Sequence, residues 1–140
     1  MEKAVIQIHT LIAAPIQKVW ENYNSPEAIK KWNQASAEWH CPSAEVDLRE
    51  GGKFRNRMEA KDGSFGFDFE GEYIQIIPYQ KIIYKMADDR IVNIDFLETG
   101  DRTKITIAFE AEKTNSLDMQ KEGWQAILNS FKNYTEEKYE

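Results

Sequence analysis

Hydrophobic positions in the first quarter of the chain follow a strand period and then a helix period. Residues 3–12 alternate between apolar and polar side chains, which predicts a strand. From Pro15, a residue suited to the first turn of a helix, apolar side chains recur at three- and four-residue spacing. Ser25 and Pro26 indicate a second helix start, because serine caps helices and proline fits the first helical position. We therefore expect one strand followed by two short helices, the second ending near Trp32.

The middle of the chain returns to strand-like alternation after an irregular stretch. Residues 33–50 show little periodicity, so we expect a long connection with one short strand at residues 45–48. Beyond it, apolar and polar residues alternate, and pairs of turn-forming residues separate the alternating segments. These pairs are Gly51-Gly52, Asp62-Gly63, Pro78-Tyr79, Asp88-Asp89 and Gly100-Asp101. Alternation with one polar face is typical of an antiparallel sheet that is wetted on one side.

The last 25 residues of the chain follow a helical period again. Asn115 or Ser116 can cap a helix, and apolar residues from Leu117 to Tyr134 predict about six helical turns. Gly123 interrupts this helix at a cost of about 1 kcal/mol relative to alanine. We expect it to serve packing, through close approach to the sheet or a bend that shapes a cavity. One long helix on one apolar sheet face indicates a two-layer α+β fold, and the element order leaves open whether the layers enclose a hollow.

Length and composition indicate one globular domain. The chain has 140 residues, and no composition shift divides it, so we expect a single domain over residues 1–140. Hydrophobic residues make up 41%, which excludes disorder as the main state. The net charge of -6 argues against nucleic acid and anionic membranes as partners. No apolar run could span a membrane, Met1-Glu2-Lys3 lacks the core of a signal peptide, and Cys41 is the single cysteine, so we expect a cytoplasmic protein.

Short motifs along the chain resemble those of a known superfamily. Two of them resemble the opening of START-like (Bet v 1-like, SRPBCC) proteins: Ala14-Pro15-x3-Val19-Trp20 and Ser25-Pro26-Glu27-x3-Lys31-Trp32. Others are similar to signatures of the activator of heat-shock protein 90 ATPase homologue-like branch: Gly51-Gly52-Lys53-Phe54, Gly71-Glu72-Tyr73 with Pro78, Thr103-Lys104-Ile105, and Gly123-Trp124 with Leu128. Together these motifs cover nearly the whole chain in the right order, and their joint order is more specific than any one of them.

The resemblance implies both a fold and a function. The fold is a helix-grip, in which a curved antiparallel sheet of about six to seven strands wraps a long C-terminal helix over a deep, mostly apolar cavity. The function implied is binding of a small hydrophobic ligand, such as a lipid or a polyketide-like or flavonoid-like aromatic, without a cofactor. The eukaryotic co-chaperones that name the branch carry a separate N-terminal domain, for which 140 residues leave no room, so we do not expect activation of a chaperone ATPase.

Aromatic residues and a few polar ones are the candidates for lining such a cavity, since ligand pockets are mainly apolar. The predicted ligand-binding residues are Trp32, Trp39, His40, Asn56, Met58, Phe67, Phe69, Tyr84, Trp124 and Leu128. For each aromatic residue, filling an ordinary core is the alternative. Trp32 and Trp39 flank the irregular stretch and are the preferred pair at the cavity mouth. Asn56 should face inward, where its amide needs a partner, either a ligand, a water or another side chain.

Two other functions stay open at this stage. A cyclase or hydrolase acting on such a ligand needs a convergent acid–base pair in the pocket, and we identify no catalytic residue. Side chains of adjacent residues such as His40 and Cys41 rarely point toward each other in the way a nucleophile and its base must. The two histidines, His9 and His40, and the single cysteine match no ligand spacing of a metal site. A chaperone- or protein-interaction module would need an exposed apolar patch, which a sequence does not reveal. We expect a monomer or a weak homodimer.

Overall fold

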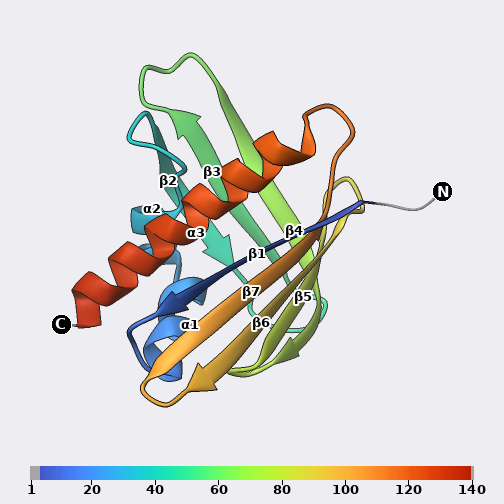
Figure 1. The fold of residues 1–140 in the computed structure, drawn as a ribbon. Helices are drawn as coiled ribbons and strands as arrows, with labels where there is room; N and C mark the ends of the chain where they lie inside the picture. The colour runs from blue at the N-terminus through green and yellow to red at the C-terminus, as the bar shows by residue number, and fades with distance from the viewer. Residues whose placement is uncertain (1–3, 140) are drawn as a thin grey trace.

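Seven antiparallel strands form one curved sheet, which a long helix crosses on its concave side (Figure 1). The computed structural model describes residues 4–139, so Lys3 of the strand predicted over residues 3–12 lies outside the described residues. The strands follow the spatial order β1-β7-β6-β5-β4-β3-β2. Their bounds are β1 (Val5–Ile12), β2 (Trp39–Val46), β3 (Lys53–Ala60), β4 (Gly66–Ile77), β5 (Lys81–Met86), β6 (Ile91–Thr99) and β7 (Arg102–Glu110).

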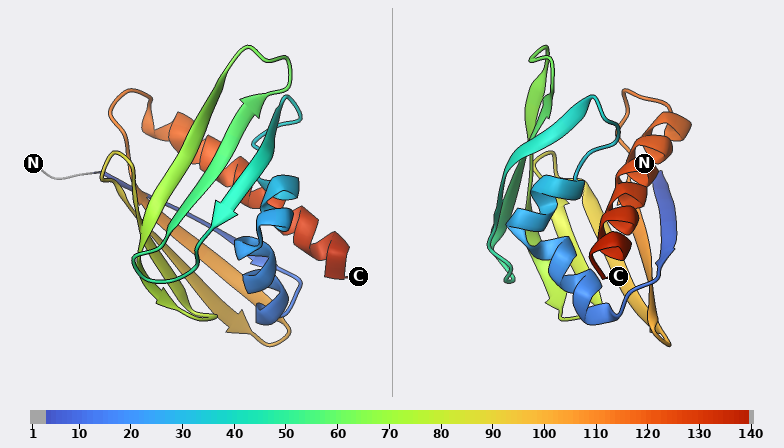
Figure 2. Two further views of the ribbon diagram at one scale, coloured as in Figure 1. Left: turned by 180° about the vertical axis from the view of Figure 1, so that it is seen from behind. Right: turned by 90° about the vertical axis from the view of Figure 1, so that its left-hand side faces the viewer.

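Three helices complete the fold and confirm the predicted order of elements. Helices α1 (Ile16–Asn24) and α2 (Pro26–Trp32) follow β1, and α3 (Leu117–Tyr139) ends the chain. The Ser25 hydroxyl accepts the amide hydrogen of Ala28, which is the capping role expected from the sequence. Figure 2 shows α1 and α2 beside the C-terminal half of α3, where they close one end of the space between helix and sheet. The α+β helix-grip architecture is therefore confirmed.

The connection between α2 and β3 differs from the prediction. We expected one short strand at residues 45–48, whereas β2 runs from Trp39 to Val46. Its pairing with β3 shifts register between His40 and Ser43, and Pro42 lies within this irregularity. An extra residue in a strand breaks the alternation of inward and outward side chains, so period-two analysis does not detect the strand. Proline fits here because β2 is an edge strand.

Helix α3 is fastened to the rest of the molecule at several places along its length. The Trp124 ring stacks on Phe109 of β7, with ring centroids 4.0 Å apart and planes 11° apart. The Ser130 hydroxyl donates to the carbonyl oxygen of Trp32 at 2.7 Å, and the Glu136 carboxylate accepts from the Ala13 amide at 2.9 Å. None of the helices within the described residues is both long and apolar enough to cross a membrane.

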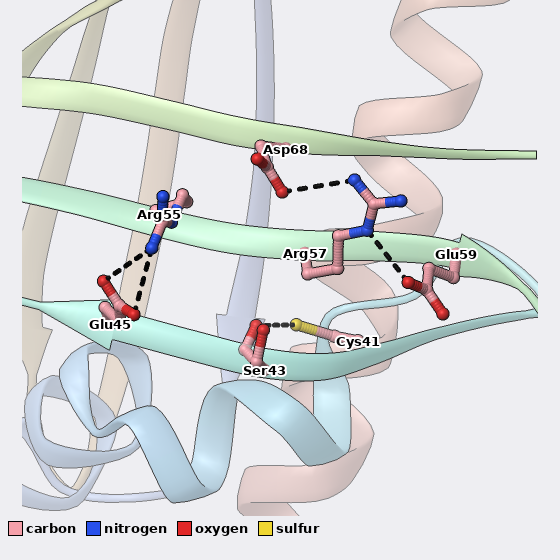
Figure 3. Close-up of polar contacts among 7 residues, drawn as sticks. All are labelled: Cys41, Ser43, Glu45, Arg55, Arg57, Glu59 and Asp68. Carbon is pink, nitrogen blue, oxygen red and sulfur yellow. Dashed lines mark hydrogen bonds and ion pairs between the residues drawn. The ribbon is translucent and has the colours of Figure 1, made fainter.

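The convex face of the sheet carries charged side chains arranged in ion pairs (Figure 3). Arg57 of β3 contacts Glu59 at 2.9 Å and Asp68 of β4 at 3.4 Å, and Arg55 contacts Glu45 at 3.2 Å. Asp68, Glu70 and Glu72 are exposed, as the alternation in this strand predicted. Exposed pairs of this kind add little to stability, so this face serves mainly as a solvated surface.

A candidate ligand-binding cavity

The concave face of the sheet and helix α3 enclose a cavity of about 420 Å³. This volume lies within the range of about 300–1,000 Å³ that is common for small-molecule sites. Strands β3 to β7 supply one wall, α3 supplies the opposite wall, and α1 and α2 supply the closed end. Apolar and aromatic side chains dominate the lining, so the cavity offers dispersion contacts and exclusion from water.

Most of the side chains predicted to bind a ligand come together around this cavity. They are Trp32, Asn56, Met58, Phe67, Phe69, Tyr84, Trp124 and Leu128. Three strands and two helices contribute them, because the inward positions of a curved sheet converge on the helix that it wraps. Phe67 is 41% exposed and therefore lies at the rim, where the cavity meets solvent. Contact with a ligand stays a prediction for each of them.

Trp39 and His40 are the two predicted residues that do not line the cavity. Both belong to the edge strand β2, which replaces the irregular stretch expected at a cavity mouth. The Trp39 ring packs against Phe67 with ring centroids 6.1 Å apart, so the Phe67 ring lies between Trp39 and the cavity. His40 Nε2 lies 3.8 Å from a carboxylate oxygen of Glu59, near the convex face. Their role in ligand binding is a prediction that this placement does not favour.

Two tyrosines that were not among the predicted ligand-binding residues also line the cavity. Tyr23 belongs to the apolar stripe of α1, and Tyr73 lies opposite Tyr84 in the pairing of β4 with β5. Both were detectable, since Tyr23 follows the helical period and Tyr73 occupies an inward position of its strand. We call Tyr23, Tyr73 and Tyr84 the cavity tyrosines. Burial raises the pKa of each hydroxyl above its ordinary value, so all three stay protonated at neutral pH.

Asn56 is the buried polar residue of the cavity that lacks a partner. It is 8% exposed, and its Oδ1 has no hydrogen bond to any of residues 4–139. By contrast, Gln120 is fully engaged: its Nε2 donates to the carbonyl oxygens of Glu112 and Asn115 at 3.1 and 2.9 Å, and its Oε1 accepts from the Glu112 amide. Gln120 therefore holds the start of α3, whereas Asn56 is available to a molecule in the cavity.

Gly123 of α3 contributes empty space. A Cβ atom built on it would meet no heavy atom within 4 Å, and the residue lines the cavity. The predicted close approach of helix and sheet at this glycine is therefore wrong. The missing side chain instead leaves room at the wall of the cavity, which any larger residue would partly occupy.

The titratable groups in and near the cavity do not form a metal site in the part of the chain that the structure describes. Within residues 4–139, no three His, Cys, Asp or Glu side chains are close enough to hold a metal ion. Cys41 lies in β2, where its Sγ donates to the carbonyl oxygen of Ser43 at 3.3 Å (Figure 3) and burial raises its pKa. Glu112 is the carboxylate that lines the cavity, and it accepts the Asn115 amide at 2.6 Å. The arrangement offers apolar contacts and neutral hydrogen-bonding groups.

Several solved structures share this fold. The AHSA1-like protein from Aeromonas hydrophila is 38% identical, with a TM-score of 0.91 over 96% of this chain and 94% of that one. A protein from Cytophaga hutchinsonii is 50% identical, with a TM-score of 0.82 over 95% of this chain and 92% of that one. A protein from Nitrosomonas europaea shares the fold at 20% identity, with a TM-score of 0.81 over 96% of this chain and 95% of that one.

Comparison with family models extends the likeness from fold to sequence. The comparison with curated proteins gave no match. The model of one family, however, matches residues 13–136, which include α1, α2, the strands from β2 to β7 and most of α3. This match confirms the resemblance that the motifs of the sequence indicated. The chain belongs to the Activator of Hsp90 ATPase homolog 1-like protein family.

Proposed function

We propose that this protein binds a small, mainly apolar molecule in the cavity between the sheet and α3. The observation that supports this most is the cavity of about 420 Å³, whose lining includes many aromatic rings. Transfer of apolar ligand surface from water provides roughly 25 cal/mol per Å² before the costs of ordering. Burial of about 200 Å² of ligand would therefore provide roughly 5 kcal/mol of gross affinity.

The aromatic lining favours flat or rigid ligands. Phe54 lies between Phe69, Tyr73 and Tyr84, with ring centroids 4.8 to 5.9 Å away. The contact with Tyr84 is edge-to-face and the other two are tilted, and such arrangements leave ring faces and edges available to a further aromatic ring. Among the expected ligand classes we therefore place polyketide-like and flavonoid-like aromatics before flexible lipids. We further propose that the protein acts as a monomer or weak homodimer in the cytoplasm, where its free Cys41 stays reduced.

Binding is tested with N-phenyl-1-naphthylamine, an apolar aromatic probe whose fluorescence rises in an apolar site. We expect saturable binding by the wild type and at least about tenfold weaker binding by Gly123→Leu, because leucine would occupy the open space beside this residue. Glu122→Leu is the matched control, since it adds the same side chain at the neighbouring exposed position of α3. Equal binding by wild type and Gly123→Leu, or no binding by the wild type, would refute the cavity as the site.

A thermal-shift screen then identifies the ligand class. Fatty acids, sterols, flavonoids and polyketide-like aromatics are compared at matched concentrations. A ligand that binds only the folded state raises the melting temperature in proportion to the logarithm of its concentration above Kd. We expect the aromatic classes to give the largest rise and Gly123→Leu to abolish it. A rise that persists in Gly123→Leu would locate binding elsewhere on the molecule.

A further inference from the structure

The cavity tyrosines reach the lining of the cavity from three elements, α1, β4 and β5. Tyr73 and Tyr84 face each other across β4 and β5, and Tyr23 approaches from α1 at the closed end. Burial, and after it the neighbouring Tyr23 and Tyr73, raises the pKa of Tyr84 above its ordinary value. All three tyrosines are lining residues of the cavity, so each adds a hydroxyl-bearing ring to its wall.

Asn56 adds an amide to the same lining. It lies on β3, two residues from Phe54, whose ring contacts both Tyr73 and Tyr84. An Oδ1 without a partner, on a residue that is 8% exposed, is costly to stability. Tyrosine and phenylalanine differ only by the hydroxyl, so each cavity tyrosine adds a polar group to a wall that phenylalanine would line without one. A ligand in the cavity would give the Asn56 oxygen a partner and would meet the tyrosine hydroxyls in the same lining.

The charges around the cavity decide what kind of partner this is. Arg90 is a lining residue with a positive charge, but its Nε donates to Asp88 at 2.8 Å and its Nη1 donates to the carbonyl oxygen of Glu110 at 3.3 Å. It is therefore already neutralised. Burial in the cavity also disfavours a negative charge on a ligand, because among residues 4–139 the lining holds no cation free to compensate its desolvation.

We propose that Tyr23, Tyr73, Tyr84 and Asn56 form the polar end of the ligand site and select uncharged ligands that carry a carbonyl or hydroxyl oxygen on a rigid apolar body. This inference rests on the proposed binding function and specifies its ligand class. The tyrosine hydroxyls donate to the ligand oxygen, and the Asn56 amide complements a hydroxyl or carbonyl beside it. A carboxylate of the same shape is excluded by its charge.

The inference is tested by competition against bound N-phenyl-1-naphthylamine, which carries no oxygen. The competitors are 2-acetylnaphthalene and 2-naphthoate, which have nearly the same shape and differ in charge. We expect the ketone to compete at least about tenfold more strongly at neutral pH. Tyr23→Phe, Tyr73→Phe and Tyr84→Phe should each weaken the binding of the ketone, relative to that of the apolar probe in the same variant, by about three- to tenfold, the value of one hydrogen bond. Tyr79→Phe is the control, because Tyr79 is exposed and does not line the cavity.

Each outcome separates this inference from the proposed function. If the apolar probe does not bind, the proposed function fails and the inference falls with it. If the probe binds but neither compound competes, or if naphthoate competes as strongly as the ketone, the cavity binds ligands and the proposed selectivity is wrong. Unchanged ketone affinity in all three tyrosine variants would likewise overturn the role of the hydroxyls and leave the binding function intact.

Discussion

Replacing Asn56 with leucine should raise the free energy of unfolding, although Asn56 lies in the middle of the candidate site. The amide is 8% exposed and its Oδ1 has no partner among the described residues. An unsatisfied buried polar group costs about 1–3 kcal/mol, and leucine has a similar volume without that cost. Allowing for imperfect packing of the branched side chain, we expect a gain of about 1–2 kcal/mol. For a chain of this length the melting temperature should rise by about 3–8 °C.

The assay is urea unfolding followed by tryptophan fluorescence, with Asn93→Leu as the matched control. Asn93 lies in β6, where its Oδ1 accepts from Lys81 at 3.3 Å and its Nδ2 donates to Asp95 at 2.8 Å. Because these bonds would be lost, the control should be neutral or destabilised. The reasoning is refuted if Asn56→Leu loses stability to the same degree as the control, since the Asn56 amide would then be satisfied in the folded protein.

Three further predictions concern other parts of the fold. Gly71→Ala should destabilise the protein by about 1–3 kcal/mol in the same assay, because a Cβ atom would lie 2.8 Å from the Phe54 ring; wild-type stability would contradict this close packing. Partial burial raises the pKa of Glu136, but hydrogen bonds from Ala13 and Lys132 outweigh this effect and lower it below its ordinary value. The contribution of Glu136 to the stability of the folded state is therefore present above about pH 4.3 and is lost in more acid solution. Glu136→Gln should therefore lower the free energy of unfolding by less than about 1 kcal/mol at pH 7 and make it fall less steeply as the pH is lowered. The same fall in stability at acid pH in wild type and variant would refute this role. In an ultraviolet titration the cavity tyrosines, three of the six in the chain, should ionise only above their ordinary pKa of about 10. Their contribution to the free energy of unfolding is full below that pH and is lost as the pH rises above it. Titration of all six tyrosines near pH 10 in the folded protein would count against the burial of these three.

The sequence was sufficient to predict the fold because its periods are clear. Alternation in β3 to β7 and the helical stripe of α3 both arise from burial of one face, which leaves a signal in every turn or pair of residues. Strand β2 was predicted poorly because its bulge beside Pro42 breaks the alternation. Phe65 fits the inward pattern but is 59% exposed, since the hairpin between β3 and β4 extends beyond α3 (Figure 1).

The candidate site could be predicted only in part from the sequence. The alternation of apolar and polar residues predicts which face of a strand a residue occupies. Whether an inward side chain then lines a cavity or packs against another side chain depends on the curvature of the sheet. Gly123 illustrates this, because the same glycine permits close packing or leaves a space according to how far α3 stands from the strands. Trp39 and His40 illustrate the converse, since a strand in place of a loop moved them away from the cavity.

If the polar groups of the cavity are kept for a ligand, their combined removal should separate stability from selectivity. We expect the variant Tyr23→Phe/Tyr73→Phe/Tyr84→Phe/Asn56→Leu to fold, to be at least as stable as the wild type, and to keep its affinity for N-phenyl-1-naphthylamine within a few-fold. Its affinity for 2-acetylnaphthalene should fall by more than about 30-fold. This is less than the product of the effects of the single substitutions, because the contributions of neighbouring groups that bind one oxygen are not additive. Calorimetric unfolding and the competition assay measure the two properties. A variant that is less stable and still prefers the ketone would show that these side chains hold the fold together and that ligand selection lies in the apolar walls.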